Sequence, residues 1–405
     1  MTENRTALVI GGGIAGPVTA MALRRAGIEA RVYEAYDKPA DGIGGMLGLA
    51  PNGLDALGVL GADGAVRDIG LPVTSMVMRS WTGKRLAEFG DGRGPVFHAV
   101  RRGELYRALY DEAARRGIEI EHGKRFVGAE DHGDGVTATF ADGSRATADI
   151  LIGADGIRSA VRGLLHPGIR PRYTGLLGFG GFLSSATALP PTNGSMHMVF
   201  GKRAFFAYQV EDCGRTGWFA NLPRREPMTL AQARAVGNAE WLRVLTDVFA
   251  GDRVPAVEIL RRCAPEELVV VGALEDLPRI PQWSKGRIVL VGDAAHATSP
   301  SSGQGVSQAV ESAVQLARCL RDLPAAEEAF AAYERLRRAR VERMITAGAR
   351  TNRDKAAGPV GRVVRDAVMP VAMKLLAKPG KMAWQTEYHI DWEERVSPVG
   401  PAPVR

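Results

Sequence analysis

Cysteine is scarce in this sequence. The 405 residues contain only Cys213, Cys263 and Cys319, which lie far apart and form no Cys-x-x-Cys pair. A disulfide framework and a cysteine-based zinc cluster are therefore excluded as organising features, and no metal site is predicted. Because disulfides belong to oxidising compartments, this cysteine usage favours a cytoplasmic protein.

The sequence also lacks a long apolar run. No stretch approaches the ~18 consecutive apolar residues of a membrane-spanning helix, so no integral membrane association is expected. Residues Met1 to Thr6 are polar and lead directly into the apolar run Ala7 to Ile10. The basic start and the small-residue cleavage site of a signal peptide are missing, so secretion is not expected either.

Neither sign of charge is in large excess. Lys and Arg number 52 against 45 Asp and Glu, a net charge of +7, and 45% of the residues are hydrophobic. This composition is ordinary for a globular protein and favours a small-molecule partner over nucleic acid. The length predicts two or three packing units, while monomer and homodimer both stay open.

A glycine-rich turn stands out against this ordinary background. Gly11, Gly13 and Gly16 follow the strand-like run Ala7 to Ile10 and open a helical pattern, with GxGxxG spacing. Without side chains, the backbone N–H groups can approach a pyrophosphate at the positive end of the helix. Glu34 closes the next predicted strand, where a carboxylate can accept hydrogen bonds from a ribose diol. The alternative is a tight turn with a surface glutamate.

A second motif ends another strand. Asp149 to Gly156 reads DILIGADG, so the strand delivers Asp155 and Gly156 to a sharp turn. Arg158 and Arg162 follow at a spacing that places both on one helical face, an arrangement suited to phosphate. An ordinary Asp-Gly turn with solvated arginines is the alternative.

The third motif is late in the chain. Gly286 to Asp293 reads GRIVLVGD, which places Asp293 at the end of a strand, where it can accept hydrogen bonds from a polyol. The turn Ser299 to Gly305 then precedes a long helix, whose N-terminal N–H groups could hold a flavin anion. Simple helix capping is the alternative for this turn. His296 is interpreted as a residue that orders the turn.

Together these motifs resemble the FAD-dependent aromatic hydroxylases, the single-component flavoprotein monooxygenases with the para-hydroxybenzoate hydroxylase fold. The resemblance covers about Ala7 to Glu334 and includes the Arg-x-x-Leu of Arg102 to Leu105. It implies tightly bound, noncovalent FAD, with NAD(P)H and O2 as co-substrates. The expected reaction is hydroxylation, or related oxygenation, of a small aromatic or polycyclic molecule through a flavin C4a-hydroperoxide, in natural-product tailoring or degradation for example.

The resemblance also assigns residues to the cofactor. The ADP half of FAD, the ribityl chain, the isoalloxazine ring and the NAD(P)H-contacting segment are expected to involve Gly11, Gly13, Ala15, Gly16, Glu34, Arg102, Asp155, Gly156, Arg158, Arg162, Asp293, Gly303, Gly305 and Val306. Pro300 is expected to border the ring, where its carbonyl would orient substrate or hydroperoxide.

The substrate is expected to meet a β-rich region. Candidate pocket residues are Phe182, Phe205, Phe206 and Trp218, with His197 and Tyr208 as candidate bases for a phenolic substrate. Because successive strand residues face opposite sides, either Phe206 with Tyr208 or Phe205 with Ala207 can line the pocket, but not both sets.

The predicted fold is α/β: a doubly wound FAD-binding domain of Rossmann-like, glutathione-reductase type, with an inserted β-sheet substrate domain and a C-terminal helical segment. The expected boundaries are 1–75, 98–172 and 281–350 for the FAD domain, 76–97 and 173–280 for the substrate domain, and 351–405 for a helical tail. The Arg-rich stretch Glu334 to Arg365 is predicted to be a solvated helix face. An FAD-dependent dehydrogenase or reductase, or a noncatalytic binding protein, on the same fold stays open.

Overall fold

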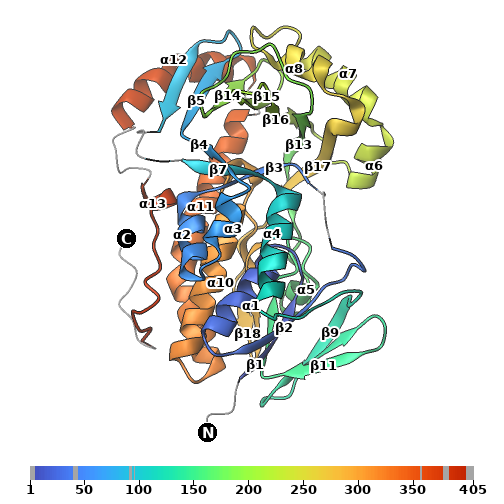
Figure 1. Cartoon of the computed structure of the whole chain (residues 1–405), viewed down its shortest axis with the longest axis vertical. Helices are drawn as coiled ribbons and strands as arrows, with labels where there is room; N and C mark the ends of the chain where they lie inside the picture. The colour runs from blue at the N-terminus through green and yellow to red at the C-terminus, as the bar shows by residue number, and fades with distance from the viewer. Residues whose placement is uncertain are drawn as a thin grey trace.

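The computed structural model describes residues 5–39, 44–90, 94, 96–355, 358–376 and 383–397. It shows an elongated molecule with a β-sheet region toward each end (Figure 1). The long helix α11 (Ala326–Lys355) extends from the lower region in this view toward the upper one. In the described ranges, none of the helices combines the length and apolarity that a membrane span requires.

The lower region is built on a six-stranded sheet. Central strand β1 pairs in parallel with β12 on one side and with β2 on the other, and β12 pairs in parallel with β19. The central runs are apolar because both faces of this sheet are covered. The strand order is β18 (Ser284–Lys285), β19 (Ile288–Leu290), β12 (Ile150–Gly153), β1 (Thr6–Ile10), β2 (Glu29–Tyr33) and β8 (Ile120–Glu121).

Helices and a small sheet cover this six-stranded sheet. Helix α1 packs on strands β1 and β2 and against α4 and α10, while the antiparallel β9–β11 sheet contacts β1 and β12. The largest apolar core of the protein lies between these layers. The elements are α1 (Ala15–Arg25), α4 (Arg102–Arg115), α10 (Gly305–Asp322), β9 (Phe126–Asp131), β10 (Val136–Phe140) and β11 (Arg145–Ala148).

The upper region is a seven-stranded sheet made from residues 75–89 and 172–276. Helices α6 (Leu230–Ala235), α7 (Asn238–Phe249) and α8 (Ala256–Arg262) contribute residues to the apolar cluster on one face of it. The strand order is β17 (Leu268–Asp276), β13 (Arg172–Leu183), β16 (Thr216–Pro223), β15 (Phe205–Val210), β14 (Ser195–Phe200), β5 (Ser75–Ser80) and β6 (Arg85–Phe89).

The other elements of the described residues are one small sheet and a set of helices. The remaining strands form one sheet in the order β3 (Met46–Leu49), β7 (Phe97–Arg101) and β4 (Leu71–Val73). The remaining helices are α2 (Pro51–Val59), α3 (Asp63–Arg67), α5 (Ala160–Leu165), η1 (Pro265–Glu267), α9 (Asp293–His296), η2 (Pro300–Ser302), α12 (Pro359–Leu376) and α13 (Ala383–Thr386). The predicted fold class is confirmed; the exact domain boundaries stay a prediction.

One prediction about the C-terminal helices is wrong. The Arg-rich stretch was expected to face solvent, and helix α11 does form there. However, the Arg337 side chain is fully buried and pairs with the equally buried Glu311 of α10. Arg340 also pairs with Glu311, at 2.8 Å. The inner side of α11 is therefore a charged contact with α10 rather than a solvated face.

Candidate functional site

The candidate site lies where parallel strands of the six-stranded sheet end. Because β2, β1, β12 and β19 are neighbours and run in the same direction, their carboxyl ends meet at one edge. Glu34 follows β2, Gly11 follows β1, Asp155 lies just after β12 and Asp293 just after β19. All three motifs found in the sequence are thus brought to one edge, the usual ligand-binding position of such sheets.

The glycines of the first turn have different surroundings. A Cβ on Gly11 would lie 2.6 Å from the Ala154 carbonyl oxygen, and Gly11 has a φ of 107°. A Cβ on Gly16 would lie 1.9 Å from the Gly11 carbonyl oxygen. At Gly13 a Cβ would meet nothing within 4 Å. Gly11 and Gly16 are therefore required for the fold itself, whereas Gly13 borders open space.

The N-terminus of α1 is open in the same turn. Its N-cap residue, Ile14, makes no side-chain hydrogen bond to the first N–H groups of the helix, which carry a partial positive charge. Glu34 stands beside this turn, since its Oε2 accepts from the Gly12 N–H at 2.6 Å and its Oε1 from the Tyr36 N–H at 3.0 Å. Both carboxylate oxygens keep further lone pairs for a ligand.

Asp155 is engaged within its own turn. Its Oδ1 accepts from the Ser159 hydroxyl at 2.5 Å, and its Oδ2 accepts from the N–H groups of Ala160 and Val161 at 2.7 and 3.1 Å. These contacts satisfy orphan donors at the N-terminus of α5. The carboxylate therefore orders the strand-to-helix turn, while Gly156, with a φ of 76° and free space at its Cβ position, leaves the backbone approachable.

The two arginines of this motif point to different surroundings. Arg158 is exposed and pairs with Glu275 at 2.6 Å. Arg162 is buried and donates to the carbonyl oxygens of Ala294 at 3.1 Å and Ile157 at 2.6 Å. The prediction that both guanidinium groups share one phosphate-binding face is therefore wrong. Arg162 instead ties the second motif to the third.

Asp293 begins α9 and is close to Arg102. Part of Asp293 is exposed to solvent. The protein around its carboxyl group nevertheless disfavours the charged form and raises the pKa. The positive charge of Arg102 offsets this effect only partly. Arg102 begins α4, and its backbone N–H donates to the Gly45 carbonyl at 3.0 Å. A Cβ on Gly44 would lie 2.8 Å from Arg102 Cδ, so the backbone at Gly44 passes directly over the Arg102 side chain.

The turn η2 leads into the N-terminus of α10. Pro300 is exposed, and its carbonyl accepts from the Gly303 N–H at 3.1 Å. Gly303 has a φ of 64°, a conformation that favours glycine. Helix α10 begins at Gly305, followed by Val306, and its N-cap residue makes no side-chain capping bond. The first N–H groups of α10 are therefore available to a ligand.

His296 contacts helix α10, and its role in ordering the turn stays a prediction. Its side chain is buried, and Nε2 lies 2.9 Å from the Ser312 hydroxyl of α10. Burial, reinforced by the positive charge of Arg337, lowers its pKa to about 3. The imidazole is neutral near pH 7 and packs against Trp283, with ring centroids 5.1 Å apart.

Sequence reasoning missed the end of helix α11, which packs against η2. A Cβ on Gly348 would lie 3.2 Å from Ser302 Cβ, and Asn352 accepts from the Ser299 hydroxyl at 2.8 Å. One turn further on, the Lys355 ammonium donates to Ser301. The spacing of 348, 352 and 355 places these residues on one helical face. This spacing is visible in the sequence, but it does not distinguish a face that contacts η2 from a solvated face.

The candidate substrate residues divide between the two faces of the seven-stranded sheet. Phe206, Tyr208 and Trp218 belong to the cluster packed with α7 and α8. His197 shares their face, since Nδ1 lies 2.8 Å from the Tyr208 hydroxyl. Burial lowers the His197 pKa to about 4 and raises that of Tyr208. Phe206, Tyr208 and Trp218 form core beneath the helices and His197 is half-buried beside Tyr208, which corrects their expected role in the pocket.

Phe205 and Phe182 lie on the other face. Phe205 clusters with Ala207 and Phe219, so of the two alternative sets the structure selects Phe205 with Ala207. The Arg101 guanidinium lies 4.2 Å from the Phe182 ring centroid, and the Cβ position of Gly217 is 3.2 Å from the same ring. This face therefore combines aromatic rings with cations from β7 and α11.

Comparisons with known proteins decide the family. A sequence model described as "FAD binding domain" matches residues 4–192 and 278–348, more than half of the chain. The FAD-dependent urate hydroxylase of Klebsiella pneumoniae is 32% identical over 84% of this chain and 87% of its own length. The 3-amino-4-hydroxybenzoate 2-monooxygenase of Streptomyces platensis is 33% identical over 93% of this chain and 95% of its own length.

The chain belongs to the FAD-dependent aromatic hydroxylases. A crystal structure of Klebsiella pneumoniae HpxO with FAD and uric acid matches this hydroxylase fold with a TM-score of 0.82. The match covers 93% of this chain and 95% of HpxO, at 27% sequence identity. The protein is accordingly an FAD-dependent monooxygenase.

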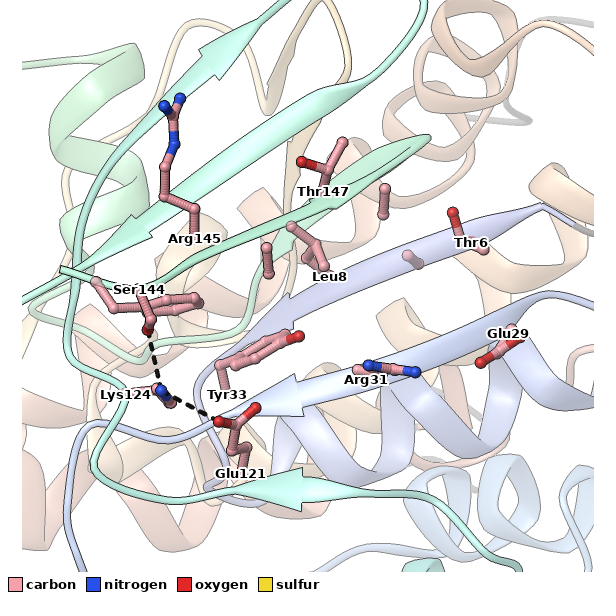
Figure 2. Close-up of a pocket in the computed structure, with 14 residues that line it drawn as sticks. Thr6, Leu8, Glu29, Arg31, Tyr33, Glu121, Lys124, Ser144, Arg145 and Thr147 are labelled. Carbon is pink, nitrogen blue, oxygen red and sulfur yellow. Dashed lines mark hydrogen bonds and ion pairs between the residues drawn. The ribbon is translucent and has the colours of Figure 1, made fainter. Parts of the chain in front are cut away.

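A separate cavity of this hydroxylase lies away from the candidate site. This cavity has a volume of about 420 Å³. It lies between β1, β2 and the β9–β11 sheet (Figure 2). Thr6 to Leu8 line it, whereas the glycine turn lies at the other end of β1. Its Lys124 is paired with Glu121 at 3.2 Å and Asp142 at 2.8 Å. No member of the three motifs lines this cavity.

Proposed function

We propose that this monooxygenase uses NAD(P)H and O2 to hydroxylate a small aromatic or polycyclic molecule. The observation that carries the proposal is the meeting of two open helix N-termini, those of α1 and α10, with Asp293 at one sheet edge. Urate and 3-amino-4-hydroxybenzoate, named for two relatives, are both small cyclic molecules with ionisable groups. NADH and NADPH remain equal candidates as the electron donor.

The glycine turn fits the ADP half of FAD. The open space at Gly13 and the uncapped N-terminus of α1 leave room and N–H donors for the pyrophosphate. Ala15 is the first residue of that helix. The Glu34 carboxylate, fixed by the Gly12 N–H, would accept from the ribose hydroxyls and repel a 2′-phosphate.

The third motif fits the flavin half. Asp293 would accept from the ribityl hydroxyls, with Arg102 alongside, and the N–H groups of Gly305 and Val306 would face the ring where negative charge develops on reduction. Pro300 and Gly303 would border the ring. When bound, FAD supplies electron transfer from the nicotinamide and activation of O2. In the second motif, only the Gly156 backbone stays a candidate contact, because Asp155, Arg158 and Arg162 have other partners.

Oxygen labelling tests the reaction class. Substrates would be found by screening small aromatic acids, phenols and polycyclic phenols for faster NADH or NADPH oxidation. With ¹⁸O2, one labelled atom is expected in the product because the hydroxylase inserts oxygen directly, and mass spectrometry measures it. A dehydrogenase would insert none. Oxygen drawn only from labelled water would contradict the proposal, and the heat-denatured protein serves as the control.

Asp293→Ala tests the ribityl contact. A hydrogen bond to a carboxylate contributes about 1.5 to 3 kcal/mol, so FAD affinity is expected to fall roughly 10- to 150-fold. Fluorescence titration of the apoprotein with FAD measures this directly. Asp134→Ala, on the exposed loop between β9 and β10, is the control and should bind FAD normally. An unchanged affinity in Asp293→Ala would remove this residue from the site.

A further inference from the structure

Lys355, the last residue of α11, joins the η2 turn to the seven-stranded sheet. Its Nζ donates to Asn221 Oδ1 of β16 at 2.7 Å and to Ser301 Oγ of η2 at 3.1 Å. The same ammonium lies 4.1 Å from the Phe205 ring centroid and 5.7 Å from that of Phe219. Lys355 therefore sits between the turn expected to border the flavin ring and the sheet face that carries the buried Phe205 and the half-buried Phe219.

The charge of Lys355 is not neutralised by the groups around it. The four side chains that contact the amine from β15, β16 and η2 are two phenyl rings, an amide and a hydroxyl. In the part of the chain that the structure describes, no carboxylate forms an ion pair with it, and no charged group shifts its pKa. Burial alone lowers its pKa to about 7. Keeping a desolvated ammonium group charged without a counter-charge costs free energy, and a bound anion would remove that cost.

The ammonium group has hydrogen-bonding capacity left for such an anion. An ammonium group has three N–H donors, of which Asn221 and Ser301 accept two. Among the described residues, the third donor has no hydrogen-bond acceptor, and it lies beside the rings of Phe205 and Phe219. A flat substrate packed against the half-buried Phe219 ring could place an acidic oxygen against that donor, in a charge-assisted hydrogen bond.

We propose that Lys355 is a specificity-determining residue that binds an anionic oxygen of the substrate, a carboxylate or an ionised ring hydroxyl, beside the η2 turn. The inference rests on the proposed function, because it takes the substrate to lie between η2 and Phe219. It adds that the preferred substrate is an acid, and it assigns that preference to the end of α11.

The test compares acids with neutral partners of the same shape. The probes are 4-hydroxybenzoate with 4-hydroxybenzamide, 3-amino-4-hydroxybenzoate with its amide, and 4-nitrophenol with 4-nitroanisole. Binding to the FAD-loaded protein is followed by the change in flavin absorbance. We expect the wild-type protein to bind at least one acid tenfold or more tightly than its partner, and the pair that responds distinguishes a carboxylate from an ionised hydroxyl.

Variants of Lys355 test whether this residue causes the preference for acids. Lys355→Met should weaken the preferred acid about 10- to 100-fold and leave its neutral partner within about twofold, because only the charged contact is lost. Lys355→Arg should retain most of the preference. Lys202→Met is the matched control, since Lys202 also lies over an aromatic ring, 4.1 Å from the Trp81 centroid, but in another part of the sheet.

The pH dependence of affinity distinguishes a charged contact from a structural role, because a structural role would not change with the protonation of Lys355. The carboxylate probes stay ionised between pH 6 and 9. Wild-type affinity for them should fall as pH rises through the lysine pKa, because the amine loses its proton, and Lys355→Met should show a flat profile. FAD content and thermal midpoint of each variant identify any that fail to fold, in which case Lys355→Gln replaces Lys355→Met.

Three results would overturn the inference: no acid preferred by the wild-type protein, an undiminished preference in Lys355→Met, or equal losses for acids and neutral partners. The last would make Lys355 a structural tie between α11 and β16. A protein that binds FAD and inserts oxygen but gives any of these results refutes only the role of Lys355. A protein that inserts no oxygen into any screened substrate refutes the proposed function separately.

Discussion

Gly13→Val is expected to give a folded protein that no longer retains FAD. A Cβ at this position meets nothing within 4 Å, so the apoprotein accommodates the side chain without moving its neighbours. The same open space is where the cofactor pyrophosphate must approach the N–H groups of α1. Because a branched side chain would occupy that approach, the loss of FAD should be essentially complete, at least a hundredfold in affinity.

Flavin absorbance of the purified protein and titration with added FAD measure this effect. Gly128→Val is the control, since a Cβ there also meets nothing within 4 Å, but in strand β9. Gly16→Ala gives the contrasting case: its Cβ would lie 1.9 Å from the Gly11 carbonyl oxygen, so that variant should lose folded protein rather than only FAD. Normal FAD affinity in Gly13→Val would move the pyrophosphate away from this turn.

The nucleotide-binding region could be predicted because its signals are local. A short apolar strand, a glycine turn and a helix follow one another within residues 6–25, and Gly11 and Gly16 are required by backbone that lies nearby in the fold. Parallel pairing then brings the ends of distant strands to one edge, which a parallel sheet requires. The positions of Glu34 and Asp293 at that edge thus follow from their places at strand ends.

The substrate face could not be assigned in the same way. Alternation along β15 separates Phe205 from Phe206, but the side chains on both faces of this strand are buried. The deciding feature is the helical layer of α6 to α8, which covers the face of Phe206, Tyr208 and Trp218. No local pattern in β15 states which face those later helices will cover.

The predictions for the arginines of the second motif and of α11 are wrong for a related reason. An arginine at helical spacing has the same sequence signature whether it faces solvent or a buried acceptor. The acceptors of Arg162 are backbone carbonyls, one of them at Ala294, 132 residues later in the chain. The partner of Arg337 is Glu311 on another helix. Such long-range partners become visible only once the helices are packed.

Glu311→Gln is expected to destabilise the protein more than any surface charge change. Burial disfavours the ionised carboxylate, but Arg337 and Arg340 outweigh this effect and hold the Glu311 pKa below its usual value. Asn52 also donates to it, at 2.5 Å. Removing the negative charge leaves Arg337 fully buried without a counter-charge, a change that typically costs about 3 to 5 kcal/mol.

Urea unfolding followed by circular dichroism measures the change. Glu130→Gln, which breaks the exposed pair with Arg145, is the control and should cost less than about 1 kcal/mol. The double variant Glu311→Gln with Arg337→Met should recover part of the loss, because it removes the unpaired charge. A loss no larger than that of Glu130→Gln would show that the buried pair contributes little.

The pH dependence of stability provides a second check, because the direction of the change is known in advance. Because the folded-state pKa of Glu311 is lowered, its stabilisation is complete above the unfolded value of 4.5 and is lost as pH falls through the folded-state value. The difference in unfolding free energy between wild type and Glu311→Gln should therefore be constant near neutral pH and shrink below about pH 4. A difference that grows toward acid pH would mean that Glu311 is protonated in the folded protein, and that the two arginines are stabilised by neutral hydrogen bonds instead of by its charge.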